Sequence, residues 1–230
     1  MSMLGSFRQI SPALLERIKA EPALAEAVVR ARPAGGAPAN DIEAYLSLLP
    51  GHLRAVMDEM APEMRSAFVA ELERSLPDLP PPLQQQIAAA RTPAPSGGPA
   101  LDPEDLGRDL HIEKAWHGVH FLLCGVPAAA PPPLGDAVLG GAEVGPDAGY
   151  GPARYLEAEQ VAALAAALQE LPPAEVADRY DAVLLDAQEI YPDGWSGEDR
   201  VEWMRESYAR LRDFYLDAGR EGLAVLLWIS

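Results

Sequence analysis

Apolar residues recur at two different spacings along the chain, and the spacing predicts which segments form helices. The clearest helix covers residues 196–222, where an apolar residue returns every third or fourth position. Its apolar face consists of Val201, Met204, Tyr208, Leu211, Tyr215 and Ala218. Ser196 and Asp199 have the spacing of a capping box, and Gly222 is placed to end the helix. A second amphipathic helix is predicted over residues 157–171.

Short apolar runs near both ends of the chain predict strands. Residues 2–11 have the pattern of a first strand, and residues 223–230 that of a buried last strand. Strand-like pieces also occur in the Gly/Pro-rich segment 131–156. We therefore predict an α+β fold, with a small, mainly antiparallel sheet that includes both terminal strands and is packed by helices.

Shorter helices are predicted on both sides of the middle of the chain. Ser11 and Pro12 are the N-cap and first-turn residues of a helix that ends near residue 20. A second helix follows over 21–31, and residues 172–192 predict two short helices.

The middle of the chain is predicted to be an insertion. Residues 41–92 contain only short helical patterns separated by prolines, and Pro/Gly-rich linkers flank them at 32–40 and 93–104. Because strand-containing sequence lies on both sides, we expect a core formed by 1–30 and 105–230, with an all-helical insertion.

Polar residues that can bind metals lie along one side of a predicted histidine helix, residues 112–124. Its apolar face is formed by Ile112, Ala115, Trp116, Val119, Leu122 and Leu123. Beside that face runs a stripe of potential zinc ligands, Glu113, His117, His120 and Cys124. One helix rarely supplies a complete tetrahedral shell, and no second His/Cys cluster follows, so we predict no metal and a structural role for the stripe.

The same helix gives expectations for individual side chains. Trp116 is expected in the core, and His120 at the margin of the core, hydrogen-bonded to a neighbour. His117 lies farther round the helix and is expected to be more exposed, and to face any pocket. A Cys124–His pair for catalysis is disfavoured, since a cysteine late on a helix gains no help from the helix dipole in becoming a thiolate.

Two further segments carry candidate ligand-binding residues. The turn "GYGPAR", residues 149–154, presents Tyr150 and Arg154, and an arginine in an acidic region can hold a carboxylate or phosphate by two hydrogen bonds. Pairing of Arg154 with a nearby acid is the alternative. The segment "EIYPDGW" adds Glu189, Tyr191 and Trp195 as possible pocket walls.

Charge and composition narrow the classes of partner. The net charge is −17, and residues 101–230 carry most of it, with 24 acidic and 9 basic side chains. Such a surface repels a phosphate backbone, so nucleic-acid binding is not expected. The sequence contains no run long enough to span a membrane, no signal peptide, one cysteine and no phosphate-binding loop, so we expect a cytoplasmic protein without a cofactor.

Several of these segments together resemble a known family. "LHIEKAWHGVHFLLCG", "LGGAEVG", "GYGPARYLEAEQVAALAAAL", "AQEIYPDGW" and "LRDFYLDAGREGLAVLLWIS" resemble, in this order, the YfbM-like family of bacterial proteins. The resemblance covers roughly residues 1–30 and 105–230 and implies an α+β fold of unknown function, with no catalytic residue to carry over. Family members usually have a short connection where residues 41–100 stand here, which supports the insertion.

Three functions remain open at the level of sequence. The favoured one is a non-catalytic binding or interaction protein, with another protein held through the helical insertion. The second is a small-molecule binder or an enzyme with a site near residues 113–124 and 149–154. The third is an immunity-type protein that neutralises a partner toxin, for which an acidic surface suits a basic target. The oligomeric state is not predicted.

Overall fold

The structure, a computed structural model, describes residues 3–31, 101–197 and 199–230. The described residues on both sides of the first gap pack into one unit. The predicted linker 32–40 and helical insertion 41–92 lie outside the described residues, as does most of the linker 93–104. The domain boundaries therefore stay a prediction.

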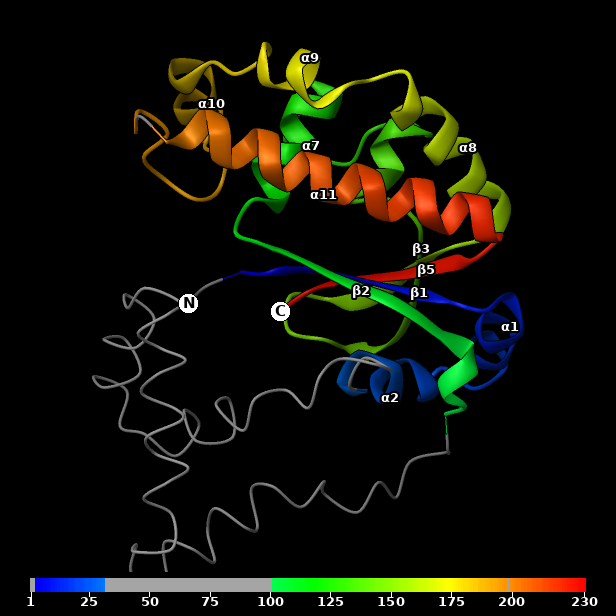
Figure 1. The fold of residues 1–230 in the computed structure, drawn as a ribbon. Helices are drawn as coiled ribbons and strands as arrows, with labels where there is room; N and C mark the ends of the chain where they lie inside the picture. Colours follow the sequence, from blue (N-terminus) through cyan, green and yellow to red (C-terminus); the bar gives the residue numbers. More distant parts are fainter. Residues whose placement is uncertain (1–2, 32–100, 198) are drawn as a thin grey trace, which may run out of the picture. The chain divides into compact units, whose positions relative to one another are not determined.

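A five-stranded antiparallel sheet forms the centre of this unit, in the order β2–β1–β5–β4–β3 (Figure 1). Its strands are β1 (Gly5–Ile10), β2 (Leu106–Glu113), β3 (Ala142–Asp147), β4 (Pro152–Leu156) and β5 (Ala224–Ile229). The first and last of these strands pair along their whole length, from Gly5 with Ile229 to Ile10 with Ala224. The predicted α+β fold, with both terminal strands in one antiparallel sheet, is confirmed.

Helices cover both faces of the sheet (Figure 1). One face carries α7 (Trp116–Cys124), α8 (Ala158–Gln169), α9 (Pro173–Ala177), α10 (Ala182–Ala187) and α11 (Arg200–Glu221). The other face carries α1 (Pro12–Ala20) and α2 (Leu24–Arg30), and short 3₁₀ turns form at Pro103–Asp105 and Leu134–Ala137. No helix in the described part of the chain is long and apolar enough to cross a membrane.

Alternation along the strands gives each face its own apolar core, because successive side chains point to opposite sides of a sheet. Phe7 and Leu227 belong to the core under α7, α8 and α11. Ile10 and Leu226 belong to the second core, which α1 and α2 cover. The sheet is therefore buried on both faces.

Helix starts and stops follow the sequence signals in most places. The Ser11 hydroxyl accepts the Leu14 N–H at 3.0 Å, as expected for the N-cap of α1. At the start of α8, Glu157 and Gln160 form a reciprocal capping box. The two short helices predicted within 172–192 are α9 and α10.

The long helix α11 differs from its prediction at one end. It begins at Arg200 rather than after Ser196, and Asp199, its N-cap residue, makes no side-chain cap. Gly222 ends it with φ +66°, as predicted. The predicted apolar face is buried except for Val201, which is 40% exposed in the first turn.

Residues 106–113 form a strand, which corrects the predicted histidine helix. Ile112 and Glu113 are the last residues of β2, and α7 begins only at Trp116. Glu113 has φ +47°, so the backbone turns sharply there and the helical wheel cannot extend across it. Glu113 therefore does not lie on one helix face with His117.

Candidate functional site

The two histidines of α7 hold the loop that follows the helix. His117 Nε2 lies 3.1 Å from the Pro127 carbonyl oxygen, and His120 Nε2 lies 2.8 Å from that of Ala128. Because a carbonyl oxygen only accepts hydrogen bonds, each Nε2 carries the proton. Gly125, with φ +72°, ends α7 and lets the loop turn back along it.

The Nδ1 atoms of both rings face hydrogen-bond donors. His117 Nδ1 accepts the backbone N–H of Tyr191 at 3.0 Å. His120 Nδ1 lies 3.9 Å from Cys124 Sγ, within reach of the thiol proton. Burial lowers the pKa of both imidazoles, which favours their neutral form. Both rings are thus engaged on both nitrogens while neutral.

These contacts test the expectations about the histidine helix. Trp116 is buried, as predicted. His120 is fully buried rather than at the margin of the core, and it has the predicted hydrogen bond. His117 is the more exposed of the two, as predicted. Its ring stacks on Trp116 at 4.8 Å between centroids and both nitrogens are bonded, so its polar atoms are already in use, and the expectation that it faces a pocket stays a prediction.

The stripe of possible metal ligands does not come together as a ligand shell. Glu113 ends β2, while the ring nitrogens of His117 and His120 are directed at loop groups and Cys124. Among the described residues, no group of three His, Cys, Asp or Glu side chains is arranged to hold a metal ion. Burial raises the pKa of the Cys124 thiol, which disfavours the thiolate that a metal or a nucleophilic mechanism needs.

A cleft of about 260 Å³ lies between the sheet and the segments that cover this end of it. Its floor is made of residues that share the α7 face of three neighbouring strands: Gly5 and Phe7 on β1, Leu227 and Ile229 on β5, Pro152 and Arg154 on β4. Its other lining residues are Met3, Trp116, Val138, Leu139, Tyr150 and Trp228.

The register of the strands places the floor residues in one row across the sheet, and the side chains in this row change from apolar to charged. Phe7 pairs with Leu227, Leu227 pairs with Arg154, and Arg154 pairs with Glu143 on β3. Phe7 and Leu227 are buried, whereas Arg154 is half-buried and Glu143 is exposed. A ligand lying along this row would therefore meet hydrocarbon at one end and a guanidinium at the other.

Gly5 allows the aromatic wall to approach the sheet. A Cβ at this position would lie 2.7 Å from Trp116 Cβ, which is closer than real side chains pack. The Trp116 indole N–H donates to the Met3 carbonyl oxygen at 3.3 Å, and this contact fixes the ring against the first strand. Trp116 is a lining residue that the sequence analysis assigned only to the core.

Arg154 is held at the mouth of the cleft. Its Nη1 donates to the Leu139 carbonyl oxygen at 2.9 Å, and its Nη2 lies 3.7 Å from Glu143 Oε1. The side chains of Arg154 and Glu143 are 34% and 61% exposed. Because Glu143 is 3.7 Å away and Leu139 takes only one N–H group, the guanidinium of Arg154 keeps further N–H groups with which it can bind an anion.

The turn before β4 presents Tyr150 beside this arginine. Asp147 Oδ1 accepts the N–H groups of Gly149 and Gly151 at 2.7 and 3.2 Å, and Tyr150 N–H donates to the Ile229 carbonyl oxygen. Gly149 and Gly151 have φ +136° and +101°, which other residues rarely adopt. The structure thus brings Tyr150 and Arg154, both predicted from this turn, into one cleft.

The remaining predicted residues lie elsewhere. Tyr191 stacks behind Trp116 and its hydroxyl accepts the Met3 N–H, so it supports the cleft wall without lining the cleft. Glu189 is exposed, with φ +52°. Trp195 is no pocket wall, because it is completely buried in the core, with its indole N–H on the Ile190 carbonyl oxygen.

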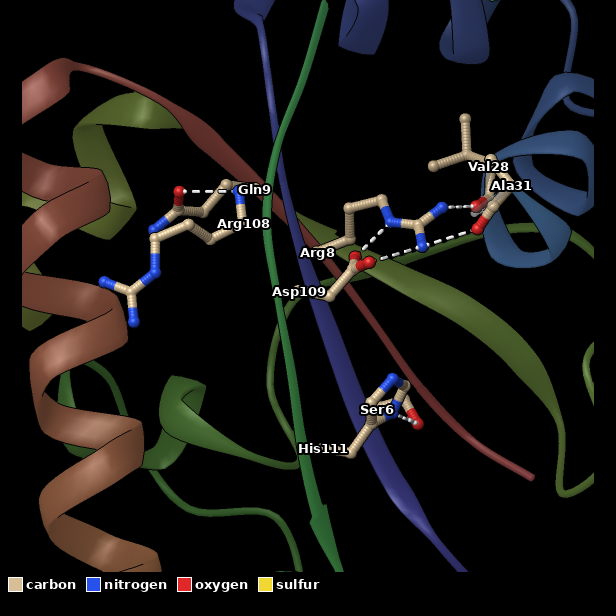
Figure 2. Close-up of polar contacts among 8 residues, drawn as sticks. All are labelled: Ser6, Arg8, Gln9, Val28, Ala31, Arg108, Asp109 and His111. Atoms are coloured by element: carbon tan, nitrogen blue, oxygen red, sulfur yellow. Dashed lines mark hydrogen bonds and ion pairs between the residues drawn. The ribbon is translucent and has the colours of Figure 1, made fainter. Parts of the chain in front are cut away.

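A second polar group, missed by the sequence analysis, lies on the opposite face of β1 and β2. Figure 2 shows Arg8 directed towards α2 and Asp109, while Gln9 points to the side of α11. The Arg8 guanidinium pairs with Asp109 and also donates to the carbonyl oxygens of Val28 and Ala31, at the end of α2. It therefore supplies the C-terminal cap of that helix.

Ser6 and His111 form the next cross-strand pair on this face (Figure 2). The Ser6 hydroxyl lies 2.9 Å from His111 Nδ1, the contact that a serine nucleophile and its base would make. Ser6 is only 4% exposed, however, whereas His111 is exposed. This pair is better explained as a hydrogen bond that joins the two strands.

Comparison with known proteins agrees with the fold and leaves the activity open. Residues 1–228 match a family described as a domain of unknown function, DUF1877. A solved structure, the protein of unknown function YfbM from Escherichia coli, is similar at a TM-score of 0.52 and 18% sequence identity, over 99% of each chain. At that identity the likeness concerns the fold alone.

No functionally curated protein matches the chain. The family match covers nearly the whole sequence and agrees with the resemblance that the sequence motifs indicated. This protein therefore belongs to the DUF1877 family, whose domain is of unknown function, and has a YfbM-like α+β fold.

Proposed function

We propose that this protein functions by binding, without catalysis, and that its core holds a small molecule in the cleft between the sheet and Trp116. The observation that carries the proposal is the cleft itself, which combines an apolar floor, aromatic walls and one guanidinium. Small-molecule sites typically have this composition, with few polar groups among apolar ones.

The histidines and the cysteine of α7 are in states that favour a binding function over a catalytic one. The neutral rings of His117 and His120 are used to hold backbone groups, and the pKa of Cys124 is raised rather than lowered. An activated nucleophile needs the opposite conditions, namely an adjacent free base or a depressed pKa.

Ligand-observed NMR with a library of small aromatic compounds tests the proposal. Leu139→Trp enlarges a half-buried wall residue and should block the cleft, so binding seen with the parent protein should be lost. Leu171→Trp is the matched control, because Leu171 is also a half-buried leucine but lies outside the cleft. If no compound binds, or if Leu139→Trp leaves binding unchanged, the proposal is wrong.

The helical insertion 41–92 is proposed as a separate surface for a protein partner, and its helical patterning and flanking linkers support this part of the proposal. A variant that lacks residues 41–92 should keep the thermal transition of the core and lose any partner captured by the full chain. Capture that is equally strong with this variant would assign the partner to the core instead. The cytoplasm suits such a protein, since its single cysteine needs no oxidising compartment.

A further inference from the structure

We propose that the ligand of the cleft is a small carboxylate carried on a flat apolar body, with the carboxylate on Arg154 and the body between Trp116 and Tyr150. This inference rests on the proposed binding function and specifies the chemical class of the ligand.

The position of Arg154 argues for an anion. Among the residues that the structure describes, it is the only cationic one that lines the cleft, and its side chain is 34% exposed. Its one short hydrogen bond in the described structure goes to the neutral carbonyl of Leu139, while Glu143 lies 3.7 Å away. A planar carboxylate can take two parallel N–H donors from the guanidinium, a stronger arrangement than the contact at 3.7 Å.

The rest of the cleft argues for a flat apolar body. Phe7 and Leu227 continue the row of Arg154 across the sheet and are 1% and 2% exposed. Trp116 lines the cleft although it is only 7% exposed, and its indole N–H is already bonded to Met3, so the part of the indole that a ligand can reach adds apolar contact rather than a donor. Tyr150 also lines the cleft and is 45% exposed, so it can supply a second aromatic face to a bound ring.

The size of the cleft limits the body to about one ring. Its volume of about 260 Å³ is below the roughly 300–1,000 Å³ of sites for drug-sized ligands. Phenylacetate has the required parts, a single aromatic ring and a carboxylate on a short arm. Phenylacetamide has the same shape without the charge, and the pair therefore isolates the role of the anion.

Titration calorimetry of the full chain with these two compounds tests the inference. Phenylacetate should bind at least about tenfold more tightly than phenylacetamide, since only the acid forms a charge-assisted pair with Arg154. Arg154→Gln should remove this preference and Arg154→Lys should keep part of it. Glu143→Gln should tighten phenylacetate binding, because it removes the carboxylate that competes for the guanidinium.

Arg212→Gln is the matched control for loss of an arginine. Arg212 Nε donates to the Leu168 carbonyl oxygen at 2.9 Å, as Arg154 does to that of Leu139, but it lies outside the cleft. This variant should keep the preference for phenylacetate. In ¹H–¹⁵N spectra, phenylacetate should shift the indole N–H signal of Trp116. The chain has four tryptophans, and the signal that disappears in Trp116→Phe is the one that belongs to Trp116.

The outcomes separate this inference from the proposed function. If phenylacetamide binds as tightly as phenylacetate and Leu139→Trp abolishes both, the cleft binds ligands but the carboxylate assignment is wrong. The assignment is equally wrong if phenylacetate does not bind while cationic or neutral library compounds occupy the cleft. If no compound of the library binds, both proposals fail.

Discussion

Arg8 and Asp109 form a two-point ion pair across strands β1 and β2, inside the protein. Nε and Nη2 of the guanidinium meet Oδ1 and Oδ2 of the carboxylate, and the side chains are 4% and 8% exposed. Because Arg8 also bonds Val28 and Ala31, this pair connects the edge of the sheet to the end of α2.

Asp109→Ala should destabilise the fold by about 3–5 kcal/mol, because it leaves a buried guanidinium without its anion. Urea unfolding followed by circular dichroism measures the loss. Glu202→Ala is the control. It breaks the ion pair between Glu202 and Arg205, whose side chains are 54% and 42% exposed, and should leave stability nearly unchanged because solvent screens such a pair. Equal losses in the two variants would contradict a stabilising role for the buried pair.

His117→Ala and His120→Ala should each destabilise the protein by about 1–3 kcal/mol, the range for leaving a buried hydrogen-bonding group unpaired. The first change frees the Tyr191 N–H and the Pro127 carbonyl, and the second frees the Ala128 carbonyl. The sequence analysis expected a hydrogen bond for His120 only, and a more exposed position facing any pocket for His117. A His117→Ala variant as stable as the parent would return His117 to that earlier interpretation.

Stability should fall as the pH drops below about 6.5. Burial lowers the pKa of His117 and His120 from the usual 6.5, so the unfolded chain binds more protons than the native protein in this range. The contribution of the neutral rings is therefore complete above pH 6.5 and is lost progressively below it. Replacing both histidines by glutamine should flatten the dependence of the urea midpoint on pH between about 7.5 and 5.5; an unchanged slope would assign the effect to other groups.

Cys124 should react slowly with iodoacetamide. Burial raises the pKa of its thiol, which leaves less of the reactive thiolate at neutral pH than in an unfolded peptide. Because the chain has one cysteine, mass spectrometry follows the reaction without ambiguity. Alkylation in the folded protein should be several-fold slower than in 8 M urea at the same concentration of reagent. Faster alkylation in the folded protein would indicate an activated cysteine and revive the Cys–His alternative.

Gly118→Ala should destabilise the protein, although alanine favours helices over glycine by up to about 1 kcal/mol. A Cβ at position 118 would lie 2.5 Å from Trp195 Cη2 and 2.7 Å from Met204 Sδ, both in the core. Overpacking of this kind costs about 1–3 kcal/mol, so the clash should outweigh the helix propensity. Thermal unfolding compares the two proteins, and a higher melting temperature for the variant would show that the core relaxes around the added methyl group.

Local patterns predicted most of the helices, because an amphipathic period and a cap depend on neighbours in sequence. The start of α7 could not be found in this way. The spacing of Ile112, Ala115 and Trp116 continues the helical pattern backwards, and the positive φ that interrupts it belongs to Glu113, a residue that gives no turn signal. Alternation of Leu110 and Ile112 was the available signal for strand β2.

The candidate site was predictable only in part for a similar reason. Tyr150 and Arg154 could be predicted as candidate site residues because they lie with two glycines and a proline in one short turn. The floor of the cleft depends on the pairing of β1, β5 and β4, which come from distant parts of the chain. The Arg8–Asp109 pair depends on the register of β1 against β2 in the same way, and these two strands are too far apart in sequence for a short turn to set that register.

The place of β5 in the sheet has a consequence for how the protein is made. This strand follows all the others in sequence, yet it lies between β1 and β4. A nascent chain on the ribosome can therefore form β1–β2 and β3–β4 only as separate halves, each with an open edge, until residues 224–229 have emerged. Closure of the sheet by such distant pairings is intrinsically slow, and until it occurs the newly made protein exposes strand edges on which chaperones can act.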